Sequence, residues 1–216
     1  MERERFLSLE PDLGIDAVRG RVRERLADYR PKTKPDLFRG DHVLSPHLKP
    51  KTPWTPAAVL VPLIERVREM TVLFTQRTDH LHVHAGQISF PGGRLETTDA
   101  DPETGALRET EEELGIPAQH VEIVGRLDTY LTRTAFEVTP VVGLLRPPFP
   151  LVPDRFEVAD VFEVPLRFLL EPANYVRHER LYAGRAAHYY AIPFGDRYIW
   201  GATAGMLRNL CEVLCK

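Results

Sequence analysis

The sequence predicts a mixed α/β or α+β fold in which strands and helices form a layered sandwich. Three observations indicate it: strand-like apolar stretches that start at Thr55, a sharply bounded helix over Asp101–Gly115, and a helical segment over Ala202–Leu214. Strands with helices between and after them are typical of layered domains. The 216 residues suffice for one domain, expected over residues 55–216, preceded by a helix and linker over residues 1–54.

Composition narrows the class of protein. Hydrophobic residues make up 43% and charged residues 27% of the chain, as in globular proteins. The net charge of -3 disfavours nucleic acid and membrane as main partners, because both reward a basic surface. No apolar run is long enough to span a membrane, and the charged start does not resemble a secretory signal. We expect a cytoplasmic protein with a small-molecule partner; a homodimer remains open. Cys211 and Cys215 are expected to pack in the protein interior and not to have a redox or metal-binding role.

The N-terminal part is expected to contain one helix. Ile15–Tyr29 carries apolar residues at helical spacing, and Asp12 or Asp16 could cap it. Residues 31–53, rich in Pro, Lys and His, are expected to be a loop that links this helix to the main domain.

The main domain starts with a predicted β-hairpin of Ala57–Ile64 and Thr71–Gln76. Further strands are expected at Gln87–Phe90, Val121–Leu127, Glu137–Leu145 and Val161–Val164, with a helical turn at Leu166–Leu170 and a second hairpin of Tyr175–Tyr182 and Ala187–Ile192. Four prolines between positions 147 and 153 exclude regular structure there.

The helix after Asp101 carries carboxylates that the sequence does not neutralise. Asp101 suits the N-cap, Pro102 the first turn and Gly115 the position after the last turn. At about 100° per residue the core-facing side holds Leu107, Thr110 and Leu114, and the opposite side holds Glu109, Glu112 and Glu113. These three glutamates are neighbours in the half of the helix where the macrodipole disfavours negative charge.

Arg108 offsets only part of this repulsion. We therefore predict that the glutamates bind a hard divalent cation, Mg²⁺ or Mn²⁺, which prefers carboxylate oxygens. The alternative is a solvated acidic helix face. Glu111 points elsewhere on the helix and is not expected to act.

A glycine-rich turn precedes this helix and adds to the motif. Gly92 and Gly93 end a strand and allow the backbone to approach a ligand closely. Gly93, five residues, Asp99, eight residues and then Arg108-Glu109-Thr110-Glu111-Glu112-Glu113-Leu114-Gly115-Ile116 resemble the Nudix box. The family pattern is Gly, five, Glu, seven, then Arg-Glu-apolar-any-Glu-Glu-any-Gly-apolar. This sequence departs from it at Asp99, at Thr110 and in the longer spacer. The resemblance implies an α/β/α sandwich with a mixed central sheet that hydrolyses a diphosphate linkage in a nucleotide-type substrate.

A second motif narrows the substrate that the resemblance implies. Leu73 to Thr78, then His82, then Gly86 to Gly93 resemble the motif that accompanies the box in coenzyme A pyrophosphatases of the Nudix superfamily. Here Phe74, Thr78 and Ile88 replace other residues of that motif, and His82 stands where it has a second Arg; the likeness continues through 199–204. The implied reaction converts coenzyme A or acyl-CoA to 3′,5′-ADP and (acyl-)4′-phosphopantetheine. Alternatives are another nucleoside diphosphate derivative, such as ADP-ribose or a dinucleotide, and a non-catalytic nucleotide-sensing domain.

Roles follow for individual residues. Glu109, Glu112 and Glu113 are expected to bind the metal ion, with the Gly93 carbonyl able to complete the shell, and Arg108 to orient Glu112 or Glu113. The general base is Glu112 or Glu157, the latter otherwise a surface carboxylate. Substrate-binding candidates are Arg77, His82, Gly92 and Gly93, where Arg77 could instead form a strand-edge ion pair. His80, His82 and His84 alternate, which allows a zinc site or a lining of the cleft.

Overall fold

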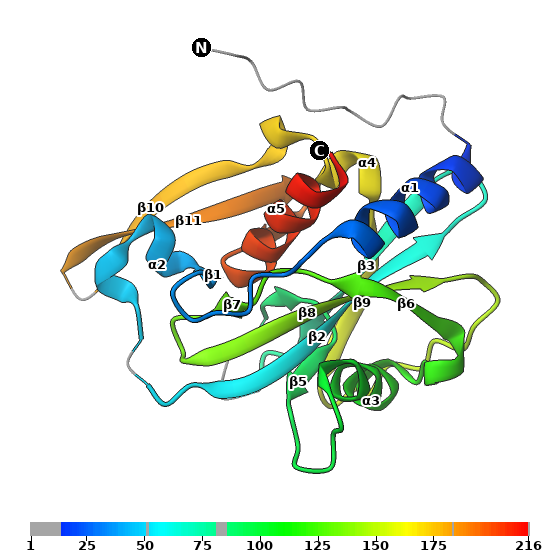
Figure 1. Cartoon of the computed structure of the whole chain (residues 1–216), viewed down its shortest axis with the longest axis horizontal. Coiled ribbons are helices and arrows are strands. Elements are labelled where there is room, and N and C mark those ends of the chain that lie inside the picture. Colours follow the sequence, from blue (N-terminus) through cyan, green and yellow to red (C-terminus); the bar gives the residue numbers. More distant parts are fainter. Residues whose placement is uncertain (1–13, 51, 81–85, 183, 216) are drawn as a thin grey trace.

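Helices cover both faces of a central sheet in the computed structural model, which describes residues 14–50, 52–80, 86–182 and 184–215 (Figure 1). Helix α3 (Pro102–Leu114) lies against one face, and α1 (Ile15–Asp28) and α5 (Ala202–Leu214) lie on the other. The predicted α/β/α arrangement is therefore confirmed. None of the described helices is long and apolar enough to cross a membrane.

The central sheet is mixed. Within the described residues its strands are β1 (Arg39–Gly40), β2 (Thr55–Glu65), β3 (Met70–Arg77), β4 (Ile88–Ser89), β5 (Gly92–Arg94), β6 (Val121–Arg126), β7 (Tyr130–Leu131), β8 (Phe136–Leu145) and β9 (Val158–Pro165). Their main order is β1-β7-β8-β2-β3-β4, with β5 paired to β2, β6 to β8 and β9 to β3. Strand β2 runs parallel to β8 and antiparallel to β3 and β5, so the predicted hairpin of β2 and β3 is confirmed.

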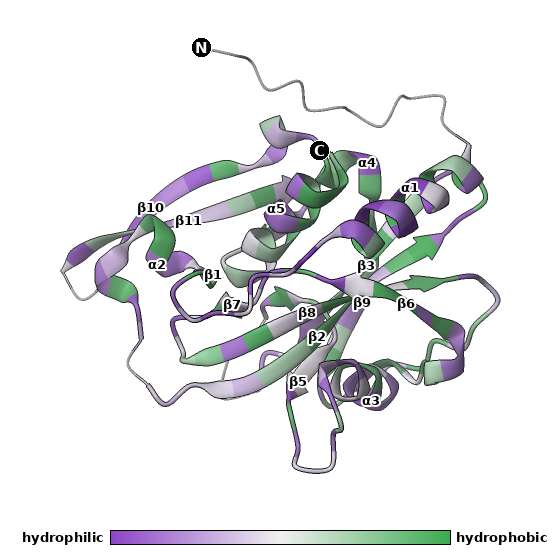
Figure 2. Cartoon of the chain, viewed as in Figure 1, coloured by the Kyte–Doolittle hydropathy of each residue, from purple (hydrophilic) through white to green (hydrophobic). Residues whose placement is uncertain are grey.

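Apolar side chains fill the space on both faces of this sheet. Val22 of α1 and Leu210 of α5 join the larger core, and Leu114 of α3 packs into a smaller one with Ile64 and Leu73. Strands β2 and β3 are buried on both faces, as expected of strands with helices on each side. Figure 2 shows the hydrophobic colour on the central strands and the last turns of α5, while α1 and α3 show purple faces.

A smaller antiparallel sheet follows in the second half of the chain. It consists of β10 (Val176–Tyr182), β11 (Arg185–Phe194) and β12 (Arg197–Trp200). The second predicted hairpin is thus confirmed, as is the helical turn, observed as α4 (Leu166–Leu169). The strand β12 was not predicted, because its four residues precede a glycine turn and lack a long apolar pattern.

The structure corrects three local predictions. Helix α1 begins after Gly14 without a side-chain cap, and Asp16 lies inside its first turn. Leu107 is only half-buried, because Ala106 takes the core-facing position on α3. The expected loop over 31–53 contains β1, α2 (Asp41–Leu44) and a 3₁₀ turn (Pro46–Leu48). Contacts with distant residues, such as the pairing of β1 with β7, stabilise these short elements.

Asp128 ties the N-terminal segment to the main body of the protein. Its buried carboxylate accepts hydrogen bonds from the Tyr29 hydroxyl at 2.6 Å, the Lys32 amide at 2.8 Å and Arg39 Nε at 2.7 Å. Its own amide donates to Asn209 Oδ1 of α5 at 2.8 Å. Burial raises the pKa of Asp128, but these hydrogen bonds outweigh it and hold that pKa below its usual value.

The division of the chain at residue 55 stays a prediction.

We predict that Asp128→Ala lowers the free energy of unfolding by about 3–5 kcal/mol, because it leaves the Arg39 charge and the Tyr29 hydroxyl without their buried partner. Urea denaturation near neutral pH measures the change. The depressed pKa means that the stabilisation is present above about pH 4 and fades as the pH falls. Asp36→Ala, at an exposed position, is the control. Equal stability of the two variants would show that this network does not anchor the N-terminal segment.

Candidate active site

The acidic helix α3 has the boundaries that fix its side-chain phase. Asp101 Oδ1 accepts a hydrogen bond from the Thr104 amide at 2.8 Å, and Gly115, with φ 65°, ends the helix by donating its amide to the Glu111 carbonyl. The predicted N-cap and the predicted terminating glycine are thus confirmed. Thr110 and Leu114 are fully buried, as predicted, whereas Glu113, predicted on the side opposite the core, is also buried.

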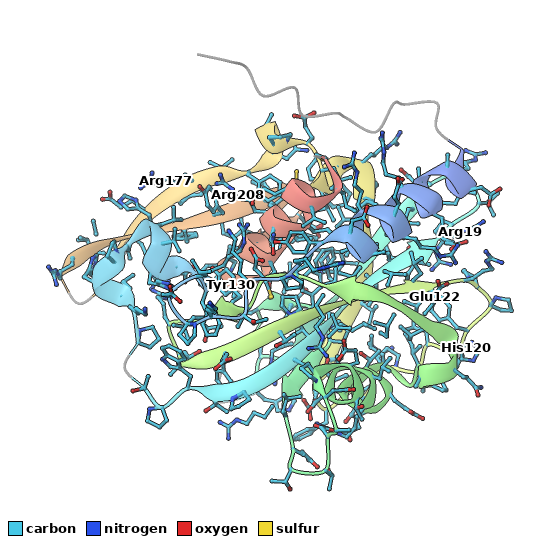
Figure 3. All side chains as sticks on the ribbon, viewed as in Figure 1. Arg19, His120, Glu122, Tyr130, Arg177 and Arg208 are labelled. Carbon is cyan, nitrogen blue, oxygen red and sulfur yellow. The ribbon has the colours of Figure 1, made fainter. Side chains whose placement is uncertain are left out.

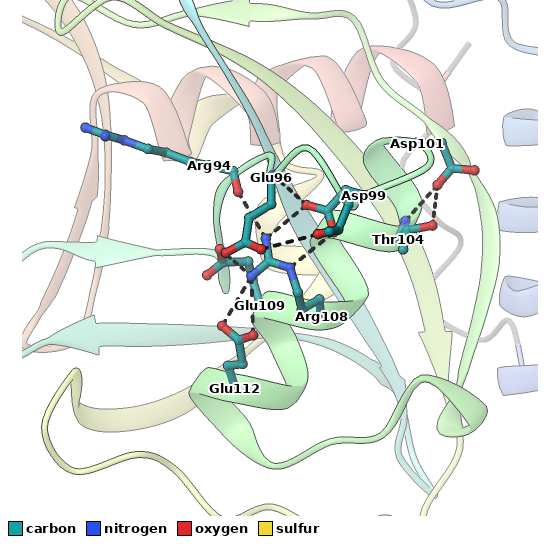
Figure 4. Close-up of polar contacts among 9 residues, drawn as sticks. Arg94, Glu96, Asp99, Asp101, Thr104, Arg108, Glu109 and Glu112 are labelled. Atoms are coloured by element: carbon teal, nitrogen blue, oxygen red, sulfur yellow. Dashed lines mark hydrogen bonds and ion pairs between the residues drawn. The ribbon is translucent and has the colours of Figure 1, made fainter.

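Arg108 lies at the centre of the acidic group (Figure 4). Its Nη1 contacts Glu109 Oε1 at 3.0 Å and Glu112 Oε2 at 3.2 Å. Its Nη2 donates to the Arg94 carbonyl of β5 at 3.1 Å. Arg108 therefore bridges two of the predicted metal ligands and joins α3 to the strand that contains Gly92 and Gly93. Of the two glutamates that it was expected to orient, it contacts Glu112.

Asp99 supports Arg108 from the loop before α3. Its two carboxylate oxygens accept from Arg108 Nε at 3.1 Å and from Nη2 at 3.0 Å. The Asp99 side chain is 3% exposed, and the hydrogen bonds from Arg108 lower its pKa. This geometry places Asp99 where it positions the Arg108 guanidinium.

Glu113 is the most buried of the three glutamates. Its side chain is 6% exposed, and Arg77 Nη1 of β3 lies 3.7 Å from its Oε1. Desolvation raises the pKa of Glu113 to about 8, and repulsion from Glu109 and Glu157 adds to the shift against the opposing effect of Arg77. A carboxylate in this environment is ionised near neutral pH only when more positive charge arrives.

The Glu109 carboxylate lies directly against the backbone of strand β5 at Gly93. A Cβ atom at Gly93 would come within 2.6 Å of the Glu109 carboxylate, so a larger residue at this position would displace that carboxylate. Desolvation raises the pKa of Glu109, while Arg108 opposes the shift. Gly93 and the Glu109 carboxylate therefore lie directly against each other.

The loop before β9 brings Glu157 to the same place. The Glu157 amide donates to the carbonyl of Asp154, within the same loop. The Glu157 carbonyl accepts from the Thr78 amide at 3.0 Å, and this bond attaches the loop to the end of β3. Glu157 Oε2 lies 3.8 Å from Arg77 Nη2. Its charge raises the pKa values of both Glu109 and Glu113. Residues 44 positions apart in sequence, Glu113 and Glu157, therefore face the same arginine.

The donor chemistry fits a divalent cation. The acidic group contains five carboxylates, those of Asp99, Glu109, Glu112, Glu113 and Glu157. Two guanidinium groups, of Arg77 and Arg108, neutralise part of this negative charge. Among the described residues no three acidic, histidine or cysteine side chains already converge as ligands, because Arg108 engages Glu109 and Glu112. Glu112 is 60% exposed and can change rotamer toward the others.

A cavity of about 540 Å³ adjoins the glycine turn, within the usual range for small-molecule sites. Gly92, Gly93 and Arg77 are among its lining residues, and Arg77 and Gly93 also contact the acidic group. Its charged lining residues are Asp41, Arg77, Arg94 and Arg133, and its larger apolar ones include Phe136, Trp200 and Met206. Cationic and apolar walls together suit an anionic ligand with an apolar part.

Some of these residues carry no local signal in the sequence. Asp41 and Arg133 lie in segments without a motif and reach the cavity only through the fold. The likeness that continued through 199–204 now has a location, because Trp200 to Thr203 line the cavity. Of the alternating histidines, His80 packs against the Phe156 ring, with centroids 4.8 Å apart. His82 and His84 lie outside the described residues.

We predict that Glu113→Gln stabilises the metal-free protein above about pH 8. The raised pKa of Glu113 means that its contribution to stability is fully present below about pH 4.5 and is lost as the pH rises through about 8. Thermal melts in chelator from about pH 5 to about pH 9 measure this, and the gap between wild type and variant should grow with pH. Glu111→Gln is the control. A gap that does not change with pH would contradict the burial of an ionisable Glu113.

Comparisons with known proteins identify the family of this chain. The family model of the NUDIX domain matches residues 54–183. The uncharacterized Nudix hydrolase NudL of Escherichia coli (strain K12) is 38% identical over 184 residues, which cover 85% of this chain and 95% of that protein. The relative of the same name from Shigella boydii serotype 18 gives the same values.

Solved structures are similar to this chain at lower identity. A C. elegans Ap4A hydrolase binary complex is 21% identical, with a TM-score of 0.43 and coverage of 51% of this chain and 80% of that one. The MutT protein from Methanosarcina mazei Go1 is 22% identical, with a TM-score of 0.44 and coverage of 56% and 83%. The family match and the NudL relatives carry the conclusion: the chain belongs to the Nudix hydrolase family.

Proposed function

We propose that this Nudix hydrolase cleaves the diphosphate bond of coenzyme A or acyl-CoA, with Mg²⁺ or Mn²⁺, to give 3′,5′-ADP and (acyl-)4′-phosphopantetheine. The observation that carries the proposal is the junction at Arg77, which lines the cavity and also lies 3.7 Å from Glu113. A diphosphate at this junction would have carboxylates for a cation on one side and arginine on the other. Gly92 and Gly93 would let it approach the backbone.

Glu109, Glu112 and Glu113 are the proposed metal ligands, and the Gly93 carbonyl is a fourth donor. When bound, the cation would supply charge neutralisation for the diphosphate and an activated water. Arg108, fixed by Asp99, holds Glu109 and Glu112 on the side of α3 that faces β5. Arg108 contacts both carboxylates within hydrogen-bonding range. Its proposed role is therefore to position these metal ligands, and not to touch the substrate itself.

Glu157 is the proposed proton acceptor for the attacking water, and Glu112 is the second candidate. Glu157 approaches the acidic face from the loop before β9, opposite the ligands of α3, and its side chain is 43% exposed. A base must reach the water that it deprotonates. Arg77 lies between Glu157 and Glu113 and would keep the two carboxylates at a fixed spacing while it meets the phosphate.

The cavity supports a substrate that is larger than a simple diphosphate. Phe136, Trp200 and Met206 offer apolar surface, whereas Arg94 and Arg133 offer positive charge. Coenzyme A combines a phosphorylated nucleoside with a long, weakly polar arm, which matches both kinds of wall. ADP-ribose or a dinucleotide would place the same diphosphate at Arg77, but neither has an extra phosphomonoester. The expectation that His82 binds substrate stays a prediction, and so does the homodimer that the sequence leaves open.

We predict that Glu112→Gln and Glu113→Gln each lower kcat by at least about 100-fold, as loss of a group that stabilises developing charge typically does. Glu111→Gln is the matched control on the same helix, and its activity should change by less than about 3-fold. Steady-state kinetics with Mg²⁺ or Mn²⁺ measure all three variants, and circular dichroism checks their folding. Near-wild-type turnover in the first two would remove α3 from the catalytic site.

We predict that a substrate panel separates the alternatives. With coenzyme A, dephospho-coenzyme A, ADP-ribose, NADH and nucleoside triphosphates, we expect the highest kcat/KM for coenzyme A or its acyl derivatives, with 3′,5′-ADP identified by mass. Chelation of the divalent cation should abolish turnover. Faster hydrolysis of ADP-ribose would keep the Nudix activity and reject the coenzyme A substrate. Binding without turnover of any compound would indicate a sensor.

A further inference from the structure

The cavity wall includes a residue, Asp41, that lies before the matched family region. Asp41, the first residue of α2, and Arg133, in the turn between β7 and β8, both line the cavity. Arg133 Nε lies 3.5 Å from Asp41 Oδ2, and the Asp41 side chain is 13% exposed. The ion pair therefore joins the N-terminal segment to the central sheet at the cavity wall.

The carboxylate of this pair is itself held in place. Asp41 Oδ1 accepts a hydrogen bond from the Tyr130 hydroxyl at 2.7 Å. Tyr130, labelled in Figure 3, is buried against α5, where a Cβ at Gly205 would clash with its ring. A largely buried ion pair is weak evidence for a gain in stability, because desolvation offsets its attraction. What the geometry shows is a carboxylate that Tyr130 holds in place beside the Arg133 guanidinium.

The turn that carries Arg133 is also fixed. Thr132 Oγ1 accepts from the Phe136 amide at 3.0 Å, and the Thr132 carbonyl accepts from the Ala135 amide at 3.1 Å. Ala135 has φ 64°, a conformation that non-glycine residues adopt only where their surroundings hold them. The backbone of Arg133 is thus held on both sides, beside the cavity.

The three arginines of the cavity have different surroundings. Arg77 lies at the acidic face, within 3.8 Å of Glu113 and Glu157. The Arg94 guanidinium lies over the Phe136 ring, 5.3 Å from its centroid, and in Figure 4 its side chain points away from the carboxylates of α3. Arg133 lies away from the carboxylates of α3, with its Nε 3.5 Å from the largely buried Asp41 carboxylate. Guanidinium donors held in a fixed plane suit bidentate binding of phosphate.

We propose that Arg133, positioned by Asp41, binds a phosphomonoester of the substrate that is separate from the scissile diphosphate. The ligand class is a nucleotide with a second phosphate group on its ribose, such as a 3′-phosphate. This inference rests on the proposed function for its physiological ligand, because coenzyme A carries such a group. It assigns the choice between phosphorylated and dephosphorylated substrate to a pair of residues outside the catalytic helix.

Calorimetric binding of two probes, 3′,5′-ADP and 5′-AMP, without metal tests the subsite independently of catalysis. Wild type should bind 3′,5′-ADP about ten- to a hundredfold more tightly, the range of a charge-assisted contact. Arg133→Ala should remove most of this preference and leave 5′-AMP binding unchanged, with Arg133→Lys in between. Asp41→Asn should reduce the preference in the same selective way. Arg146→Ala, which removes an exposed charge at another surface, should bind both probes as wild type does.

The results distinguish this inference from the proposed function. Absence of a preference in wild type, or equal weakening of both probes in Arg133→Ala and Asp41→Asn, would overturn the subsite and leave the ion pair as a structural link. Hydrolysis of coenzyme A with an unchanged preference in Arg133→Ala would retain the function and reject the subsite. A preference that depends on Arg133, without hydrolysis of coenzyme A, would retain the subsite and reject the function.

Discussion

Repulsion between carboxylates is the constraint on which the rest of this structure depends. The fold brings five of them together beside α3 and supplies two guanidinium groups. The three that α3 itself carries lie in the half of the helix where the macrodipole disfavours negative charge. Arg108 compensates the exposed part of the group, and Arg77 compensates the buried Glu113 only at 3.7 Å. A protein that keeps such an arrangement sacrifices local stability for a function that needs negative charge.

The sheet determines where this charge meets a ligand. Strand β2 pairs with β5 at Ala58 and Gly93. The two glycines of β5 therefore lie beside a central strand of the sheet, and Gly93 contacts the Glu109 carboxylate. Strand β3, on the other side of β2, ends at Arg77 and pairs with β9, whose preceding loop carries Glu157. The cavity then extends from the glycines to Asp41 and Trp200, which the segments before and after the central strands contribute.

Local patterns were enough to predict much of this arrangement. The helix α3, its cap at Asp101, its end at Gly115 and the neighbouring positions of its glutamates follow from spacing and propensity alone. The long strands follow from apolar runs of strand length. The predictions failed where distant contacts decide: Gly14 begins α1 without a side-chain cap, Ala106 displaces Leu107 from the core side, and β1 forms only because β7 is beside it.

The site shows the same division. Arg77 and Glu157 were identifiable as charged candidates, but their distances to Glu113 depend on the pairing of β3 with β9. Asp41 and Arg133 gave no signal, since they are 92 residues apart and meet only in the folded chain. Asp99, which departs from the family pattern in side chain and spacing, brings both of its carboxylate oxygens to Arg108.

Direct binding of a divalent cation tests the central claim, that the acidic face of α3 is a metal site. Titration of Mn²⁺ into the metal-free protein, followed by the electron paramagnetic resonance of free Mn²⁺, measures affinity without substrate. We predict saturable binding that Glu113→Gln weakens by at least about tenfold, as loss of one charged ligand should, while Glu111→Gln binds as wild type does. Identical Mn²⁺ affinity in wild type and Glu113→Gln would contradict the account.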